Sequence, residues 1–95
     1  MEIDKVIHEP ARLRIMMILA GLEQADFTFL ATTLSLTRGN LNRHMEKLES
    51  AGYLKVKRSF KGKVRNTSYQ ITQKGSNALA QYWEDLDAIR LSGRP

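Results

Sequence analysis

The sequence predicts a mainly helical α+β fold in which helices precede and follow a single two-stranded hairpin. Two observations carry this prediction. Apolar residues recur at helical spacing before residue 53 and after residue 72, whereas residues 53–72 alternate between apolar and polar positions, as strands do. A chain of 95 residues has room for one domain with a thin core. We expect its segments to be residues 1–25, 26–52, 53–72 and 73–92.

The first helix is expected to begin near Pro10, which suits a first helical turn, and to end at Gly21. Apolar side chains cover both of its sides, so both sides should be buried. One small core covers a single side of a helix more readily than two. We therefore expect the second side to contact another subunit, with cover by the chain's own C-terminal segment as the alternative.

Two helices separated by a tight turn are expected next. Residues 28–35 form the first of them, with Asp26 as its N-cap, and Thr37 is the N-cap of the second. The second helix should stop before Gly52, since glycine readily adopts the left-handed backbone that follows many helix ends. The order is helix, tight turn, helix.

The second helix of this pair has one side that packing explains and one that packing does not. Leu41, Met45 and Leu48 recur at i, i+4 and i+7 and form the core side. The opposite side holds Gly39, Asn42, Arg43, Glu46, Lys47 and Ser50, with Asn40 at its margin. Gly and Asn each cost a few tenths to about 1 kcal/mol relative to Ala in a helix. We therefore expect this outer side to have a role other than helix stability.

A basic hairpin follows. Residues 53–60 alternate between an apolar set, which includes Val56 and Phe60, and a lysine-rich set, as expected for a strand with one face in water. Gly62 is the expected turn residue, and residues 64–71 return as the partner strand.

A last helix should start after Thr72, a suitable N-cap, and keep apolar residues at helical spacing up to Ile89. The closing residues 92–95 are expected to fray. Together with the first helix, this helix should form the subunit contact. The residues expected there are Ile15, Ile18, Leu19, Leu22, Leu79, Tyr82, Trp83, Leu86 and Ile89.

The positive charge is concentrated in one part of the chain. The net charge is +5, but residues 36–75 hold ten Lys or Arg against two Glu, a net of +8, and the remaining residues sum to −3. A basic block confined to one contiguous segment is typical of a surface that binds a polyanion. The alternative is an ordinary solvated charged surface.

Several classes of function are not supported. The chain has no Cys, which excludes thiolate metal sites and thiol redox sensing, and His8 and His44 alone do not make a metal site. Glu84, Asp85 and Asp87 are most simply the wet side of the last helix. We expect no enzyme, no cofactor and no metal. With no apolar run of roughly 18 residues and no leader, a cytoplasmic protein is expected.

Three stretches together resemble a known family: EPARLRIMMIL, LTRGNLNRHMEKLESAGYL and SFKGKVRNTSYQITQKG. In this order they are similar to winged helix-turn-helix transcriptional regulators of the MarR/ArsR-like kind. The resemblance implies a three-helix core with a two-stranded β-wing and a C-terminal helix for dimerisation. It also implies that the second helix of the pair enters the DNA major groove, that the wing lies along the backbone or minor groove, and that the protein is a homodimer.

This resemblance offers a role for the outer side of the helix. The expected DNA-binding residues of the recognition helix are Thr37, Arg38, Gly39, Asn40, Asn42, Arg43 and Lys47. Glycine permits close approach, Asn can read adenine, and Arg can read guanine, with Arg38 and Lys47 placed for phosphates. In the wing we expect Arg58, Lys61, Lys63 and Arg65 to contact DNA. Their alternative role is to protect an edge strand from aggregation.

The function we expect is that of a sequence-specific regulator of transcription, which binds double-stranded DNA as a homodimer on a near-palindromic operator. The alternative is a winged-helix module that binds protein within a larger assembly. A small-molecule effector is left open. It would bind at the dimer interface or the wing, and Tyr82 and Trp83 are candidates for an aromatic pocket, although core or interface positions are more common for such residues.

Overall fold

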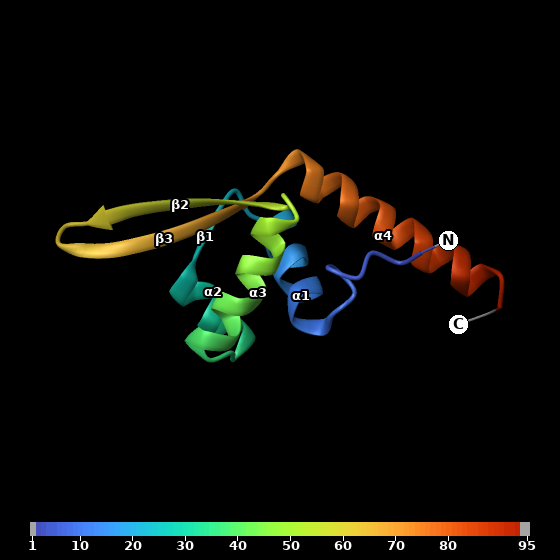
Figure 1. Ribbon diagram of the computed structural model, residues 1–95, viewed down its shortest axis with the longest axis horizontal. Helices are drawn as coiled ribbons and strands as arrows, with labels where there is room; N and C mark the ends of the chain where they lie inside the picture. Colours follow the sequence, from blue (N-terminus) through green and yellow to red (C-terminus); the bar gives the residue numbers. More distant parts are fainter. Residues whose placement is uncertain (1, 94–95) are drawn as a thin grey trace.

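The computed structural model describes residues 2–93, and these form four helices and a three-stranded antiparallel sheet. The helices are α1 (Pro10–Ala20), α2 (Phe27–Leu34), α3 (Arg38–Ser50) and α4 (Gln73–Leu91), and the strands are β1 (Ala25–Asp26), β2 (Leu54–Lys61) and β3 (Val64–Ile71). Helices α1, α2 and α3 cluster together, while the β2–β3 hairpin and α4 extend from the cluster in opposite directions (Figure 1). The predicted mainly helical α+β class and the winged helix arrangement are confirmed.

The ends of α1 are set by local chemistry. The Glu9 carboxylate accepts hydrogen bonds from the backbone N–H groups of Ala11 and Arg12, at 2.9 and 3.1 Å, and Pro10 occupies the first helical position. At the other end, Gly21 is the C-cap and donates its N–H to the Ile18 carbonyl. The expected start at Pro10 and end at Gly21 are both confirmed.

The segment before α1 is held against the start of the wing. Asp4 accepts hydrogen bonds from the backbone N–H groups of Val6 and Ile7, and the Tyr53 hydroxyl donates to its other carboxylate oxygen. Burial, together with the hydrogen bond to Asp4, raises the pKa of Tyr53 to about 12, so its hydroxyl keeps its proton. This segment therefore lies beside the C-terminal end of α3.

Helices α2 and α3 form the expected pair. Asp26 caps α2 by accepting from the N–H of Phe29, and Thr37 caps α3 by accepting from the N–H of Asn40. Between them Ser35 adopts a left-handed backbone with φ of 55°, which tightens the turn. Gly52 follows α3 with φ of 81°, as predicted.

Helix α1 lies at the centre of the core, where it contacts α2, α3, α4 and β3. The core side of α3 packs here, because Leu41, Met45 and Leu48 are all buried. Ile15 and Leu19 of α1 are fully buried as well. These two residues were expected at a subunit contact, but they have no exposed surface with which to meet a partner. The chain's own elements cover them on all sides.

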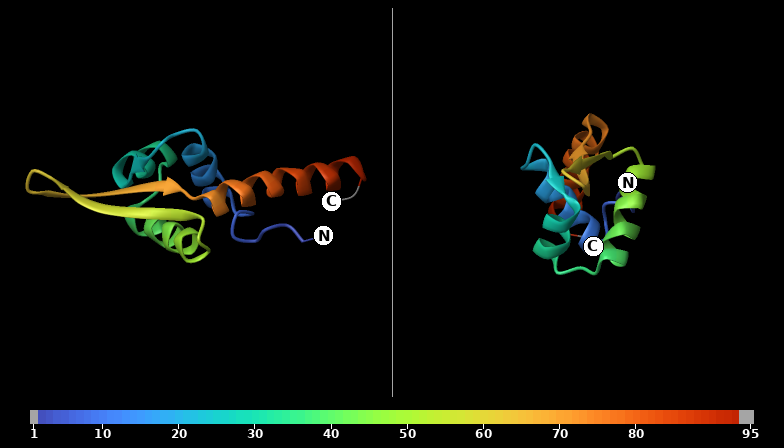
Figure 2. Two further views of the ribbon diagram at one scale, coloured as in Figure 1. Left: turned by 90° about the horizontal axis from the view of Figure 1, so that it is seen from above. Right: turned by 90° about the vertical axis from the view of Figure 1, so that its left-hand side faces the viewer.

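Part of α4 is likewise buried against the chain's own elements. Leu79 and Tyr82, also expected at the subunit contact, are buried, because the first half of α4 packs on the rest of the chain. The alternative, in which the C-terminal segment covers α1, is thus realised in part. Beyond that point α4 projects away from the helical cluster (Figure 2). Ile18, Leu86 and Ile89 are half-buried, and Leu22 and Trp83 are exposed by 43% and 40%.

The wing is a regular ladder that runs from the Leu54–Ile71 pair to the Lys61–Val64 pair, with Gly62 in the turn at φ of 64°. Strand β1, which the sequence did not predict, pairs with β3 on its other edge. The expected apolar face is only partly realised. It is covered at Leu54 and partly covered at Val56, but Phe60 is exposed because the hairpin has by then passed beyond the core.

Strand β3 leads into α4 through a tight junction. Thr72 caps α4 as predicted, because its hydroxyl accepts from the N–H of Gly75 at 3.0 Å, and the same hydroxyl donates to the Gly52 carbonyl at 2.7 Å. Gly75 is buried, and a Cβ there would collide with the Tyr53 carbonyl oxygen. Of the closing residues expected to fray, Ser92 caps α4, and residues 94 and 95 lie outside the described residues.

Candidate nucleic-acid interface

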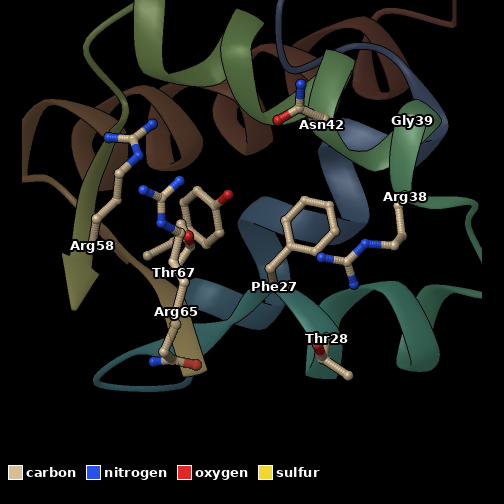
Figure 3. Close-up of a pocket in the computed structure, with 10 residues that line it drawn as sticks. Phe27, Thr28, Arg38, Gly39, Asn42, Arg58, Arg65 and Thr67 are labelled. Carbon is tan, nitrogen blue, oxygen red and sulfur yellow. The ribbon is translucent and has the colours of Figure 1, made fainter. Parts of the chain in front are cut away.

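A groove of about 540 Å³ lies where α3 meets the wing. Its walls come from the first turns of α2 and α3 on one side and from β2 and β3 on the other (Figure 3). The residues that line it are Phe27, Thr28, Arg38, Gly39, Asn42, Arg58, Arg65, Asn66, Thr67 and Tyr69. The fold therefore brings part of the expected recognition helix and part of the expected wing contacts to one groove.

The groove is strongly positive. Figure 3 shows Arg58 and Arg65 on the strand side and Arg38 on the helix side. The described residues that line it include no Asp or Glu to offset these charges. The guanidinium of Arg38 lies 4.6 Å from the centroid of the Phe27 ring, a cation–π contact that holds it at the groove. Such a groove favours an anionic partner that is long enough to touch helix and wing together.

The N-terminus of α3 opens into this groove. Gly39 is exposed, and a Cβ at its position would meet no atom within 4 Å. The glycine is therefore not required by packing inside the protein. The first turn of a helix carries free backbone N–H groups and the positive end of the helix dipole, which attract phosphate. A missing side chain at this place lets a partner approach that turn closely.

Four polar residues of α3, Arg43, Glu46, Lys47 and Ser50, lie on its other flank. Arg43 and Lys47 border a second, shallow hollow, and the guanidinium of Arg43 donates to the Asn40 side-chain oxygen at 3.3 Å. The Asn42 amide is held by the Glu46 carboxylate at 2.9 Å, across one turn. The hollow is lined by Lys5, Val6, Arg12, Arg43, Glu46, Lys47, Ser50 and Ala51. The outer side of α3 thus has two flanks, one toward the wing and one toward the N-terminal segment.

Several residues that line these two sites were missed by sequence reasoning, among them Phe27, Thr28 and Lys5. Phe27 and Thr28 reach the groove because Asp26 starts α2 directly beside it. Lys5 reaches the second hollow because the N-terminal segment folds back along α3. All three reach these sites through tertiary placement, which no local sequence pattern shows.

His44 faces inward, as expected for a packed histidine. Its Nδ1 lies 3.1 Å from the Arg12 guanidinium and 3.2 Å from the Glu9 carboxylate. Burial lowers the pKa of His44, and the nearby cations lower it further against the attraction of Glu9. Burial alone would raise the pKa of Glu9, but hydrogen bonds from two backbone amides and the neighbouring positive charges hold it below its usual value. This cluster joins the start of α1 to the middle of α3.

The positive side chains of the wing lie in two places, the groove and the tip of the hairpin. Arg58 and Arg65 line the groove, whereas Lys61 and Lys63 lie at the exposed tip beyond it. The structure therefore groups two of the four expected wing contacts with α3. The two lysines are positioned to meet only a partner that extends past the groove.

Other candidate sites are weaker. Among residues 2–93, no three His, Asp or Glu side chains gather closely enough to hold a metal ion. None of the helices in this part of the chain has the length and apolar character that a membrane crossing needs. Glu84 and Asp87 are exposed on α4, and Tyr82 shares a small cavity of about 410 Å³ with His8, whose Nδ1 is 2.8 Å from the tyrosine hydroxyl.

A helix-turn-helix followed by a β-wing, with arginines from both meeting at the start of the second helix, defines a DNA-binding protein of the winged helix class. The comparison with known families agrees, because the model described as "Winged helix DNA-binding domain" matches residues 11–89. The chain belongs to this family. The resemblance to winged helix-turn-helix regulators is confirmed, and the MarR/ArsR-like kind fits these findings.

Individual relatives support the same assignment. An uncharacterized protein of Methanocaldococcus jannaschii is 40% identical over 79 residues, which cover 82% of this chain and 85% of the relative. A transcriptional regulator homologue from Pyrococcus horikoshii superposes with a TM-score of 0.84 at 29% identity, over 92% of this chain and 86% of that one. The transcriptional repressor CouR, solved with a 23-mer DNA duplex, gives 0.72 at 28% identity, over 83% of this chain and 55% of that one.

Proposed function

We propose that this protein regulates transcription by binding double-stranded DNA in a sequence-specific way. The observation that carries the proposal is the groove in which Arg38, Gly39 and Asn42 of α3 face Arg58 and Arg65 of the wing. Cations placed on both sides of a helix N-terminus suit a duplex, whose two phosphate backbones flank a major groove. The likeness to CouR, which was solved on DNA, supports the same reading.

Each flank of α3 has a distinct role in this proposal. Asn42 and Arg43 reach the base edges, where an amide suits adenine and a guanidinium suits guanine. Both side chains are exposed and are held by neighbours one turn away, Asn42 by Glu46 and Arg43 by Asn40, so they are partly preorganised. The phosphates on the two sides are met by Arg38 and by Lys47, with Lys5 as an additional contact beside Lys47.

The protein acts as a homodimer in this proposal. The support is the outer half of α4, which projects from the rest of the chain and carries Leu86, Ile89 and the exposed Trp83. With Ile18 and Leu22 near the end of α1, these side chains leave apolar surface that a second copy would cover. A two-fold axis there would set two recognition helices about 34 Å apart, on successive major grooves. The operator should then be a near-palindrome.

The competing role, a module that binds protein, is less well supported. A protein-binding face would present exposed aromatic or apolar anchors, but the outer side of α3 presents amides and cations. We also propose no catalytic activity, since the positive groove has no nucleophile paired with a base. An effector, if one acts, has the cavity beside His8 and Tyr82 as its candidate site, while Trp83 does not line it.

Selection of bound duplexes from a random DNA pool tests this function directly. We expect enrichment of one sequence with internal two-fold symmetry and half-sites about 10 to 11 base pairs apart. Sedimentation of the protein alone at micromolar concentration should show a dimer. A pool that stays random after several rounds would contradict sequence-specific binding, whereas an enriched site without symmetry would contradict only the dimer.

A further inference from the structure

The tip of the wing carries two large apolar side chains that the protein leaves in water. Phe60 is 68% exposed and Val64 is 70% exposed. They lie next to the turn at Gly62, past the end of the core. A phenyl ring held in water on a projecting strand is disfavoured unless a partner covers it, so it marks a candidate contact.

The pairing of the strands shows which way Phe60 faces. In an antiparallel ladder, directly opposed residues share a face, and residues two apart along one strand share it as well. Phe60 is opposite Arg65 and two residues from Arg58. Because both arginines line the groove beside α3, Phe60 extends the same face toward the tip. Val64 is opposite Lys61 and belongs to the other face.

The surroundings of Phe60 restrict the chemistry of its partner. Residues 53–72 contain six positive side chains, at positions 55, 57, 58, 61, 63 and 65, and no acidic one. An apolar ring within such a field fits a polyanion that also has an apolar interior. A DNA duplex has both, since its phosphates surround a stack of bases. The continuity of this face with the groove at α3 favours the duplex over an anionic membrane.

We propose that Phe60 enters the DNA minor groove as an apolar wedge, beside Arg65, and partly separates one base step. This inference rests on the proposed binding of DNA. Apolar side chains that enter the minor groove kink the duplex toward the major groove, and arginine favours a narrow minor groove at the same time. Phe60 would then add affinity that is apolar in origin and would bend the site, whereas the lysines of the tip add only electrostatic attraction.

The test compares Phe60→Ala with Val64→Ala on one selected duplex. The two residues are matched in position and exposure but lie on opposite faces. We expect Phe60→Ala to weaken binding roughly 5- to 100-fold, as for loss of one aromatic contact with a base, with no change in the slope of log Kd against log salt. Energy transfer between dyes at the duplex ends should show a smaller bend. Val64→Ala should match the unmodified protein in both measurements.

Two results would overturn the inference while leaving DNA binding intact. One is a Phe60→Ala protein with unchanged affinity and bend, and the other is an equal loss in Val64→Ala, which would point to general disturbance of the tip. Thermal unfolding should be the same for all three proteins, because neither side chain belongs to the core. Stronger binding to anionic phospholipid vesicles than to the duplex would also contradict it. Absence of any binding by the unmodified protein would instead refute the proposed function itself.

Discussion

Replacing Gly39 by Ala should make the protein more stable and worse at binding DNA. A Cβ at this position meets nothing within 4 Å, so the methyl group causes no clash in the free protein. Alanine favours a helix over glycine by up to about 1 kcal/mol in the interior, and we expect about half of that in the first turn. For a domain of this size, the melting temperature should rise by about 2 to 4 °C.

The added methyl group should be unfavourable only in the complex with DNA. If the first turn of α3 meets the duplex closely, the added methyl group occupies the space of a phosphate or a base edge, and binding should weaken by about tenfold or more, equivalent to roughly 1.4 kcal/mol. Thermal unfolding by circular dichroism and fluorescence anisotropy on a selected duplex measure the two effects.

Ser76→Ala is the matched control for Gly39→Ala. Ser76 is exposed in the first turns of α4 and lies outside the residues that line the groove, so its replacement changes helix propensity but not the interface. It should leave affinity unchanged. A Gly39→Ala protein that is stabilised and binds DNA as tightly as the unmodified one would refute the idea that the missing side chain at Gly39 lets DNA approach α3 closely.

Four further outcomes are expected. Gly75→Ala should destabilise the fold by about 1 to 3 kcal/mol in denaturant unfolding, because its Cβ has no room at the junction of wing and α4. Arg43→Ala should cost about 1 to 3 kcal/mol on the selected site and relax its sequence preference, and equal weakening on random DNA would make Arg43 only a phosphate contact. Replacing Lys61 and Lys63 together by Ala should weaken all duplexes alike and flatten the salt slope by about one to two per subunit, whereas an unchanged slope would place the tip off the DNA. Because its folded-state pKa lies below the usual 6.5, His44 takes up a proton more readily when unfolded, so stability should be full above pH 6.5 and fall as the pH is lowered, and His44→Gln should remove this part of the pH dependence.

The parts of the fold that could be predicted from the sequence are those with local causes. Asp26, Thr37 and Thr72 cap their helices through hydrogen bonds that span three residues, so the short sequence pattern contains the whole interaction. The alternation of the hairpin and the glycine at its turn are equally local. For the same reason, the sequence correctly predicted which residues of α3 face the core and which are exposed.

The parts that were missed depend on contacts between distant segments. Strand β1 has two residues and no pattern of its own, and it exists only because β3 lies beside it. Ile15 and Leu19 looked like surplus apolar surface because the sequence does not show that α2, α3, β3 and α4 all pack around α1. Phe60 continues the apolar alternation of its strand, so the sequence predicted a covered side chain. It is exposed because the hairpin extends past the core at this point, and the local pattern does not show where that happens.

The most direct test of the central claim, that the face formed by α3 and the wing binds duplex DNA, is a titration of the unmodified protein with a random-sequence duplex at several salt concentrations. Arg38, Lys47, Arg58 and Arg65 would each release counterions on contact with phosphate, at about 0.9 in slope for each contact. We therefore expect measurable affinity at low salt and a plot of log affinity against log salt steeper than about −3 for each subunit bound. No binding at low salt, or an affinity that does not change with salt, would contradict the claim.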